Sequence, residues 1–157
     1  MTFPHEPHDE RTRVLLVDSD NSILASLYTL LENDGHEVLA ARDGREGLTI
    51  VHRSIRPINL LVTDCRTPGI TGLELARACA RRNPDVGVLY MSASPPSEEL
   101  QADLTAQRRA FLVKPVRRGE LLRKTRELLA PGFMPVATAG SPALQMAIQH
   151  AFVRQEE

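Results

Sequence analysis

Five polar residues stand directly behind apolar runs of this sequence, where a buried strand would give way to a loop. Asp18 and Asp20 follow the run "VLLV", Asp64 and Ser92 close two further runs, and Lys114 follows "AFLV". A carboxylate can attack a phosphorus centre and become an acyl phosphate. A hard divalent cation on oxygen ligands would neutralise the charges that oppose this attack, while a lysine and a hydroxyl would bind the transferred oxygens. These residue types therefore suit phosphoryl transfer.

Five strand-and-helix pairs are expected to position these residues. Continuous apolar runs predict buried strands, and apolar residues at helical spacing after each run predict helices. The expected strands are residues 14–18, 36–41, 58–64, 86–92 and 110–113, and the expected helices are 21–35, 44–55, 73–83, 97–109 and 118–129. This alternation predicts an α/β fold, a doubly wound five-stranded parallel sheet with helices on both faces. In such folds the site lies outside the carboxyl ends of the strands, so the polar residues should meet at one rim.

The composition is that of a soluble globular domain. The 157 residues are 42% hydrophobic and 25% charged, enough for one core and too few for two ordinary domains. A net charge of −1 and a pI near 6.5 indicate no strongly basic surface for nucleic acid. No apolar run approaches the roughly 18 residues of a membrane span, and the polar start is no signal peptide, so we expect a cytoplasmic protein without a membrane partner. Cys65 and Cys79 lack metal-ligand spacing and are expected to be free thiols.

Four sequence blocks together resemble the receiver domain of bacterial two-component response regulators. They are "VLLVDSD", "LLVTDCRTPGITGLEL", "LYMSAS" and "FLVKP", which follow one another in the family's order and spacing across residues 12–130. The resemblance implies the flavodoxin-like strand order 2-1-3-4-5. It also implies a protein that is not an enzyme but accepts a phosphoryl group from a histidine kinase or a phosphotransfer protein. By this resemblance Asp64 is the phosphoacceptor, Ser92 the switch hydroxyl, Phe111 the switch aromatic, and Lys114 the family's lysine, often followed by a cis bond to Pro115.

Two positions depart from the family's magnesium site. The family carries two adjacent acids after the first strand; Asp18 matches the first, but Ser19 stands in place of the second. Asp20 could reach inward as a ligand, or it could cap the following helix, where Asp is common. The resemblance implies that Mg²⁺ is held by Asp18, Asp64 and the backbone carbonyl of Arg66, with Asp20 or Ser19 as a further candidate, and more weakly than in a two-acid pocket. The Arg66 guanidinium could partly replace the cation or obstruct a phosphodonor.

Short segments are expected on either side of the receiver domain. Residues 1–11 are interpreted as a flexible tail, 131–140 as a linker rich in Pro, Gly and Ala, and 141–157 as a short amphipathic helix. That last helix is too short for a DNA-binding output domain, so no direct DNA binding is expected. It is also marginal alone, and its apolar stripe should pack on this domain, on a second copy or on a following segment. A downstream protein or a homodimer partner is expected to contact helix 97–109, strand 111–113 and helix 118–129.

A phosphatase is the first alternative. The stretch "DSDNS" fits the opening of haloacid-dehalogenase phosphatases, in which Asp18 would be the nucleophile and Asp20 the acid and base. That family needs an acidic pair after its lysine, whereas the last aspartate of this chain is Asp103. The phosphatase interpretation also leaves Asp64 unexplained.

A pseudo-receiver, which keeps the fold and the partner surface but no longer uses phosphate, is the second alternative. Ser19 and Arg66 favour it, because both weaken the expected metal site. Asp64, Ser92 and Lys114 oppose it, because all three functional groups are intact. Metal binding discriminates between the receiver and the pseudo-receiver.

Overall fold

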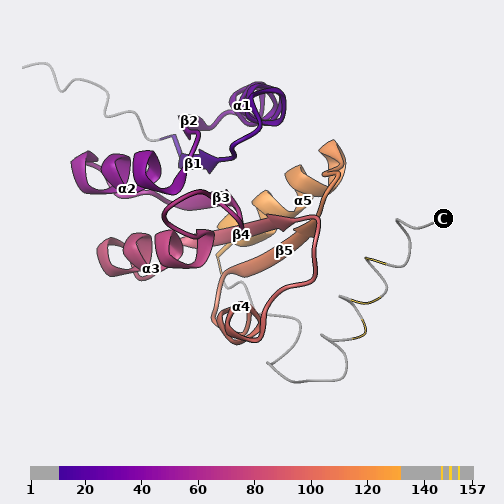
Figure 1. Cartoon of the computed structure of the whole chain (residues 1–157). Helices are drawn as coiled ribbons and strands as arrows, with labels where there is room; N and C mark the ends of the chain where they lie inside the picture. The colour runs from indigo at the N-terminus through magenta and orange to yellow at the C-terminus, as the bar shows by residue number, and fades with distance from the viewer. Residues whose placement is uncertain (1–10, 132–145, 147–148, 150–151, 153–157) are drawn as a thin grey trace, which may run out of the picture.

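Strands and helices alternate along the chain as expected. The computed structural model describes residues 11–131 together with Met146, Gln149 and Phe152. The strands are β1 (Arg13–Val17), β2 (Glu37–Ala41), β3 (Leu60–Asp64), β4 (Gly87–Ser92) and β5 (Arg109–Val113) (Figure 1). The helices are α1 (Asn21–Asn33), α2 (Gly44–Arg53), α3 (Gly72–Arg82), α4 (Glu98–Asp103) and α5 (Arg118–Leu129).

The five strands form one parallel sheet in the order β2-β1-β3-β4-β5, which confirms the expected flavodoxin-like order. The chain first adds β2 to one side of β1 and then continues with β3 on the other side. The switch point therefore lies between β1 and β3, where ligands of open parallel sheets bind. Asp64 pairs in register with Met91, and Ser92 pairs with Val113, so these strands end at the same edge of the sheet.

Two apolar layers cover the sheet, one on each face. Helices α2, α3 and α4 pack on one face, and α1 and α5 on the other (Figure 1). Because successive side chains of a strand point to opposite faces, each buried strand contributes side chains to both layers. The strand residues of the first layer include Leu15, Val17, Leu61, Val88 and Tyr90, and those of the second include Val14, Leu16, Leu60, Val62 and Leu89.

Polar residues at the strand exits also start the helices. The side chains of Asp20, Asp43 and Ser97 accept hydrogen bonds from backbone amides in the first turns of α1, α2 and α4. Thr71 and Glu74 form a reciprocal capping box at α3. Each cap satisfies amides that have no partner within their helix. The loops at this edge are thereby fixed close to the strand ends.

The fourth helix is shorter than expected. The sequence predicted a helix over residues 97–109, but α4 ends at Asp103 and Arg109 already belongs to β5. Leu104 caps the helix, and Arg108 has a φ of 59°, in the left-handed region that a right-handed helix cannot contain. The second half of that predicted helix is therefore wrong, because the chain must turn there to enter the edge strand.

The predicted tail, linker and C-terminal helix fall mainly outside the described residues. Within those segments the structure describes Arg11, Pro131, Met146, Gln149 and Phe152, of which the last three have helical conformation. Among all the described residues, no helix is both long enough and apolar enough to cross a membrane.

Candidate functional site

Lys114 joins two carboxylates at the carboxyl edge of the sheet. Its ammonium lies 2.7 Å from Asp18 Oδ2 and 2.7 Å from Asp64 Oδ2. Asp18 follows β1, Asp64 ends β3, and Lys114 follows β5, so three strand exits supply the cluster. Three of the residues that the sequence predicted for one rim are therefore in direct contact.

Backbone amides hold the other oxygen of each carboxylate. Asp18 Oδ1 accepts a hydrogen bond of 2.9 Å from the amide of Asp20, and Asp64 Oδ1 accepts one of 3.0 Å from the amide of Arg66. Asp18 is buried, with 1% of its surface exposed, whereas 16% of the Asp64 side chain is exposed. Of the two carboxylates, Asp64 is therefore the one that solvent reaches more easily.

The charges of the cluster compensate one another. Burial, the largest single effect, disfavours the charged form of Lys114, but the hydrogen bonds and charges of Asp18 and Asp64 together outweigh it. The pKa of Lys114 consequently lies above its ordinary value, and the lysine is an ammonium at neutral pH. Two carboxylates that would otherwise repel each other are thus kept together by one shared cation.

Ser92 lies at the end of β4, on the same edge of the sheet. It is buried, and its hydroxyl accepts a hydrogen bond of 3.1 Å from the amide of Ser94. The Ser92 carbonyl accepts the amide of Lys114 at 2.9 Å, which ties the end of β4 to that of β5. Ser92 therefore sits between the loop that leads to α4 and the strand that carries Lys114.

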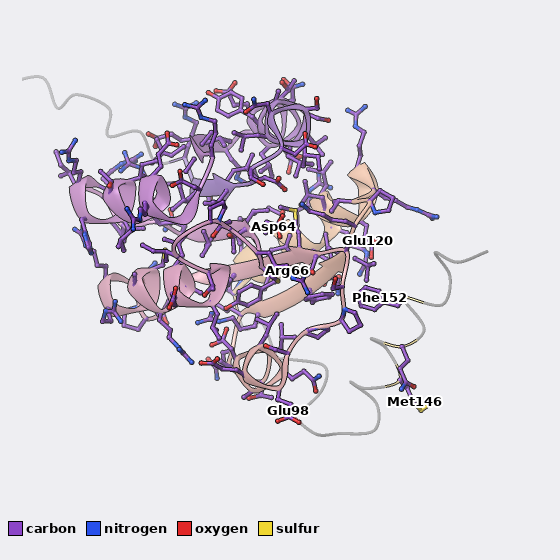
Figure 2. All side chains as sticks on the ribbon, viewed as in Figure 1. Asp64, Arg66, Glu98, Glu120, Met146 and Phe152 are labelled. Atoms are coloured by element: carbon purple, nitrogen blue, oxygen red, sulfur yellow. The ribbon has the colours of Figure 1, made fainter. Side chains whose placement is uncertain are left out.

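Asp20 serves as a helix cap. Its Oδ1 accepts the amides of Ser22 and Ile23 at 2.8 and 3.1 Å, the geometry of an N-cap. Of the two roles open to it from the sequence, the structure shows the cap. Ser19 and Arg66 are both exposed at the rim, and Arg66 lies beside Asp64 (Figure 2).

The oxygen atoms of the cluster fit a hard divalent cation. Asp18 and Asp64 offer carboxylate oxygens, each with a second lone pair beyond the hydrogen bonds named above. Magnesium prefers such ligands and usually keeps several waters, so one or two carboxylates are enough. Within the described ranges no three His, Cys, Asp or Glu side chains gather into a metal cluster. The site therefore suits a cation bound with few protein ligands.

Cys65, next to Asp64, is a poor nucleophile. Burial, helped by the neighbouring Asp64 charge, raises its pKa to about 12. The thiol stays protonated at neutral pH and therefore lacks the thiolate needed for reaction. Both cysteines are free thiols, as expected.

The loop after Asp64 depends on residues that sequence reasoning did not single out. A Cβ on Gly72 would lie 2.6 Å from the carbonyl oxygen of Asp64, so only glycine allows α3 to start this close to the strand. Thr63 donates a hydrogen bond of 2.9 Å to the same carbonyl. Thr67 is buried and donates to the carbonyl of Ile70 across the loop. In the sequence, Pro68 and Gly69 predicted a turn in this loop, but they did not predict these contacts.

Phe111 lies on β5, the strand that leads to Lys114. It pairs in register with Tyr90 and packs partly buried against the layer formed with α2, α3 and α4. The peptide bond between Lys114 and Pro115, just beyond β5, is cis, as the resemblance implied. The Phe111 side chain has no group that can form a hydrogen bond. Any coupling between Phe111 and the acidic cluster must therefore pass through β4, β5 and their loops.

A five-stranded parallel sheet with two acids and a lysine at its carboxyl edge defines a flavodoxin-like domain with an acidic site. The chain matches the model of the response regulator receiver domain over residues 14–126. It is 36% identical over 117 residues to Response regulator MprA of Mycolicibacterium vanbaalenii, and 37% identical to that of Mycobacterium leprae; each match covers 74% of this chain and 50% of the relative. The chain belongs to the response regulator receiver domain family.

Solved structures agree with this assignment. The CheY-like receiver domain protein from Methanospirillum hungatei has a TM-score of 0.68 and 31% identity, covering 76% of this chain and 94% of that one. The response regulator TrrA from Thermotoga maritima, solved in complex with Mg²⁺ and BeF, has a TM-score of 0.62 and 28% identity, covering 75% and 99%. Receiver domains are modules of two-component signalling rather than classical enzymes. The chain spans about half the length of the curated relatives it matches.

Proposed function

We propose that Asp64 accepts a phosphoryl group from a histidine kinase or a phosphotransfer protein and that the phosphorylated domain signals through contacts with other proteins. The observation that carries this proposal is the placement of Lys114, 2.7 Å from both Asp18 and Asp64, at the switch point of the sheet. That arrangement presents a partly exposed carboxylate beside a fixed ammonium.

In the proposed transfer an Asp64 oxygen attacks the phosphorus atom and the bond to the donor's histidine nitrogen breaks, which leaves neutral imidazole after proton uptake. Lys114 then pairs with an oxygen of the phosphoryl group, and the buried hydroxyl of Ser92 donates to another. Asp18, Asp64 and the carbonyl of Arg66 would hold Mg²⁺, which neutralises negative charge on the transferred group when it is bound. Ser19 supplies no charge, so this metal site should be weaker than one with two adjacent acids.

The signal passes from Ser92 toward Phe111. In this proposal, movement of Ser92 onto the phosphoryl group shifts the loop before α4 and opens room for the Phe111 ring to turn inward. The surface that partners read is then formed by α4, β5 and α5, with α4 limited to Glu98–Asp103. Phosphorylation biases the population of the two arrangements rather than creating a new fold.

Intact mass after incubation with a small phosphodonor, with and without magnesium, tests the proposal. We expect a magnesium-dependent gain of one phosphoryl group that is absent in Asp64→Asn and retained in Asp43→Asn, which alters a cap away from the cluster. Ser19→Asp should bind magnesium more tightly in a calorimetric titration. Absence of any gain at every magnesium concentration would favour the pseudo-receiver, in which only the fold and the partner surface are used.

The phosphatase alternative finds no support. Its acid and base, Asp20, is engaged in capping α1 through the amides of Ser22 and Ile23. Its nucleophile, Asp18, is buried and is the less accessible of the two carboxylates. Both observations favour Asp64 as the reacting group.

A further inference from the structure

A phenylalanine far along the chain lies against the half-buried aromatic ring of the edge strand. The ring centroids of Phe111 and Phe152 are 6.3 Å apart, and the ring planes are inclined by 50°. Both values lie within the range of favourable tilted aromatic pairs. In Figure 2 the Phe152 side chain points toward the domain, whereas Met146 points away from it.

The position of Phe111 explains why this contact is available. β5 is an edge strand, and its residues Arg109, Ala110 and Phe111 are only partly buried. Phe111 is only partly buried against the layer that includes Leu100 and Leu104, so part of its surface is left for another group. An edge strand that carries a half-buried apolar ring is a surface that proteins commonly cover.

We propose that the C-terminal segment carrying Phe152 docks in cis on β5 and thereby covers the surface through which the phosphorylated domain would contact its partners. Phe152 is the anchor, and Phe111 is the platform. The docking itself is independent of phosphorylation; its regulation by phosphate rests on the function proposed above.

The helical conformation of Met146, Gln149 and Phe152 fits a docked segment. Phe152 is partly buried whereas Met146 is 57% exposed, which agrees with a segment that is anchored through Phe152. The contact of Phe152 with Phe111 is the observed attachment of this segment to the folded domain.

The pair also links docking to the proposed switch. If Phe111 turns inward on phosphorylation of Asp64, the ring on which Phe152 rests is withdrawn. The segment then loses its anchor at the moment when the partner surface is needed. Docking and the inward position of Phe111 therefore exclude each other, and the segment acts as an internal competitor of the partner.

Hydrogen exchange of the full chain, followed by mass spectrometry of peptides from residues 141–157 and 109–113, tests the docking. We expect Phe152→Ala to speed exchange in the C-terminal peptide about tenfold, as for the loss of one aromatic pair. Phe111→Ala should have the same effect from the other side of the contact. Met146→Ala, in the same segment but exposed, is the matched control and should exchange like the wild type.

Equal exchange in the wild type and in Phe152→Ala would overturn the proposal, and this result does not depend on whether Phe111→Ala folds. Protection that disappears on dilution would also overturn it, because the Phe152 ring would then come from a second copy. A small phosphodonor should speed exchange of the C-terminal peptide in the wild type but not in Asp64→Asn. If no phosphoryl group is gained while Phe152→Ala still loses protection, the docking stands and the proposed phosphotransfer fails.

Discussion

At the scale of single residues, Lys114 connects parts of the chain that are far apart in the sequence. It contacts Asp18 across 96 positions of the sequence and Asp64 across 50. Both contacts exist only because β1, β3 and β5 end at one edge of a parallel sheet. The raised pKa of Lys114 has a defined effect on stability: its contribution is complete below the ordinary value of 10.5 and is lost as the pH rises through the higher folded value.

Asp20 permits a direct test of cap against ligand. Asp20→Asn keeps an N-cap acceptor and should change the free energy of unfolding little, whereas Asp20→Ala should lower it by about 1 kcal/mol. Because its carboxylate faces the amides of α1, both variants should bind magnesium as the wild type does. Urea unfolding and calorimetric titration measure the two effects, with Asp64→Asn as the variant expected to lose magnesium binding. Severalfold weaker magnesium binding in Asp20→Asn would identify Asp20 as a ligand.

The two thiols predict how stability responds to alkaline pH. Burial is the main cause that raises the pKa of Cys65 and of Cys79 from 9.0 to about 12. Between pH 9 and 10 the unfolded chain therefore loses thiol protons that the folded chain keeps, so stability falls as the pH rises. Each thiol can add up to about 1.4 kcal/mol per pH unit to this slope.

Replacement of both cysteines by alanine should flatten the slope, even though the lost volume lowers stability at every pH. Urea unfolding at several pH values between 9 and 10 measures this slope of the free energy of unfolding against pH. Tyr90 and Lys114 titrate from the higher ordinary values of 10.0 and 10.5, so between pH 9 and 10 they lose fewer protons in the unfolded chain than the thiols do. An unchanged slope in the double variant would show that the thiols ionise as readily in the folded domain as in the unfolded chain.

At the scale of elements, α4 is held to the sheet by a small polar network. The Tyr90 hydroxyl donates a hydrogen bond of 2.5 Å to Asp103 Oδ2, and Arg109 Nε lies 3.2 Å from the same oxygen. Asp103 is the last residue of α4, whereas Tyr90 and Arg109 belong to β4 and β5. The network therefore fixes the short helix next to Phe111, where the proposed partner surface lies.

Tyr90→Phe should loosen this attachment. Loss of a buried hydrogen bond to a charged group costs about 1.5–3 kcal/mol of unfolding free energy. Tyr28→Phe is the matched control, because the hydroxyl of Tyr28 bonds to Glu32 at the surface of α1. Urea unfolding should separate the two variants, and hydrogen exchange should be faster in residues 98–104 of Tyr90→Phe alone. Equal stability of both variants would show that the network does not hold α4.

At the scale of the whole molecule, the sequence predicted what depends on local pattern and on topology. The runs Val14–Val17 and Leu60–Val62 are apolar without interruption, which predicted buried parallel strands. The rule for strand exits then predicted that the acids and Lys114 would converge on one rim. The end of α4 was missed, because the left-handed turn at Arg108 has no glycine to mark it. The contact between Phe111 and Phe152 was equally invisible, since no periodicity relates residues that are paired only by tertiary packing.

The two layers that cover the sheet predict how core substitutions combine. Val62 packs on the α1 and α5 side and Val88 on the opposite side, both without exposed surface. Val62→Ala and Val88→Ala should each lower the free energy of unfolding by about 1–3 kcal/mol. Because the sheet separates the two cavities, the double variant should show the sum within about 0.5 kcal/mol.

A pair within one layer supplies the contrast. Leu61 lies opposite Val88 on the neighbouring strand and belongs to the same layer, so truncation of both opens one shared cavity. Leu61→Ala combined with Val88→Ala should therefore deviate from additivity by about 0.5 kcal/mol or more. Urea unfolding of the single and double variants completes both cycles. Coupling of about 0.5 kcal/mol or more in both cycles would mean that the sheet transmits packing changes between its faces. Coupling in the Leu61 cycle alone would mean that a change beneath α4 and Phe111 can occur without disturbing α1 and α5.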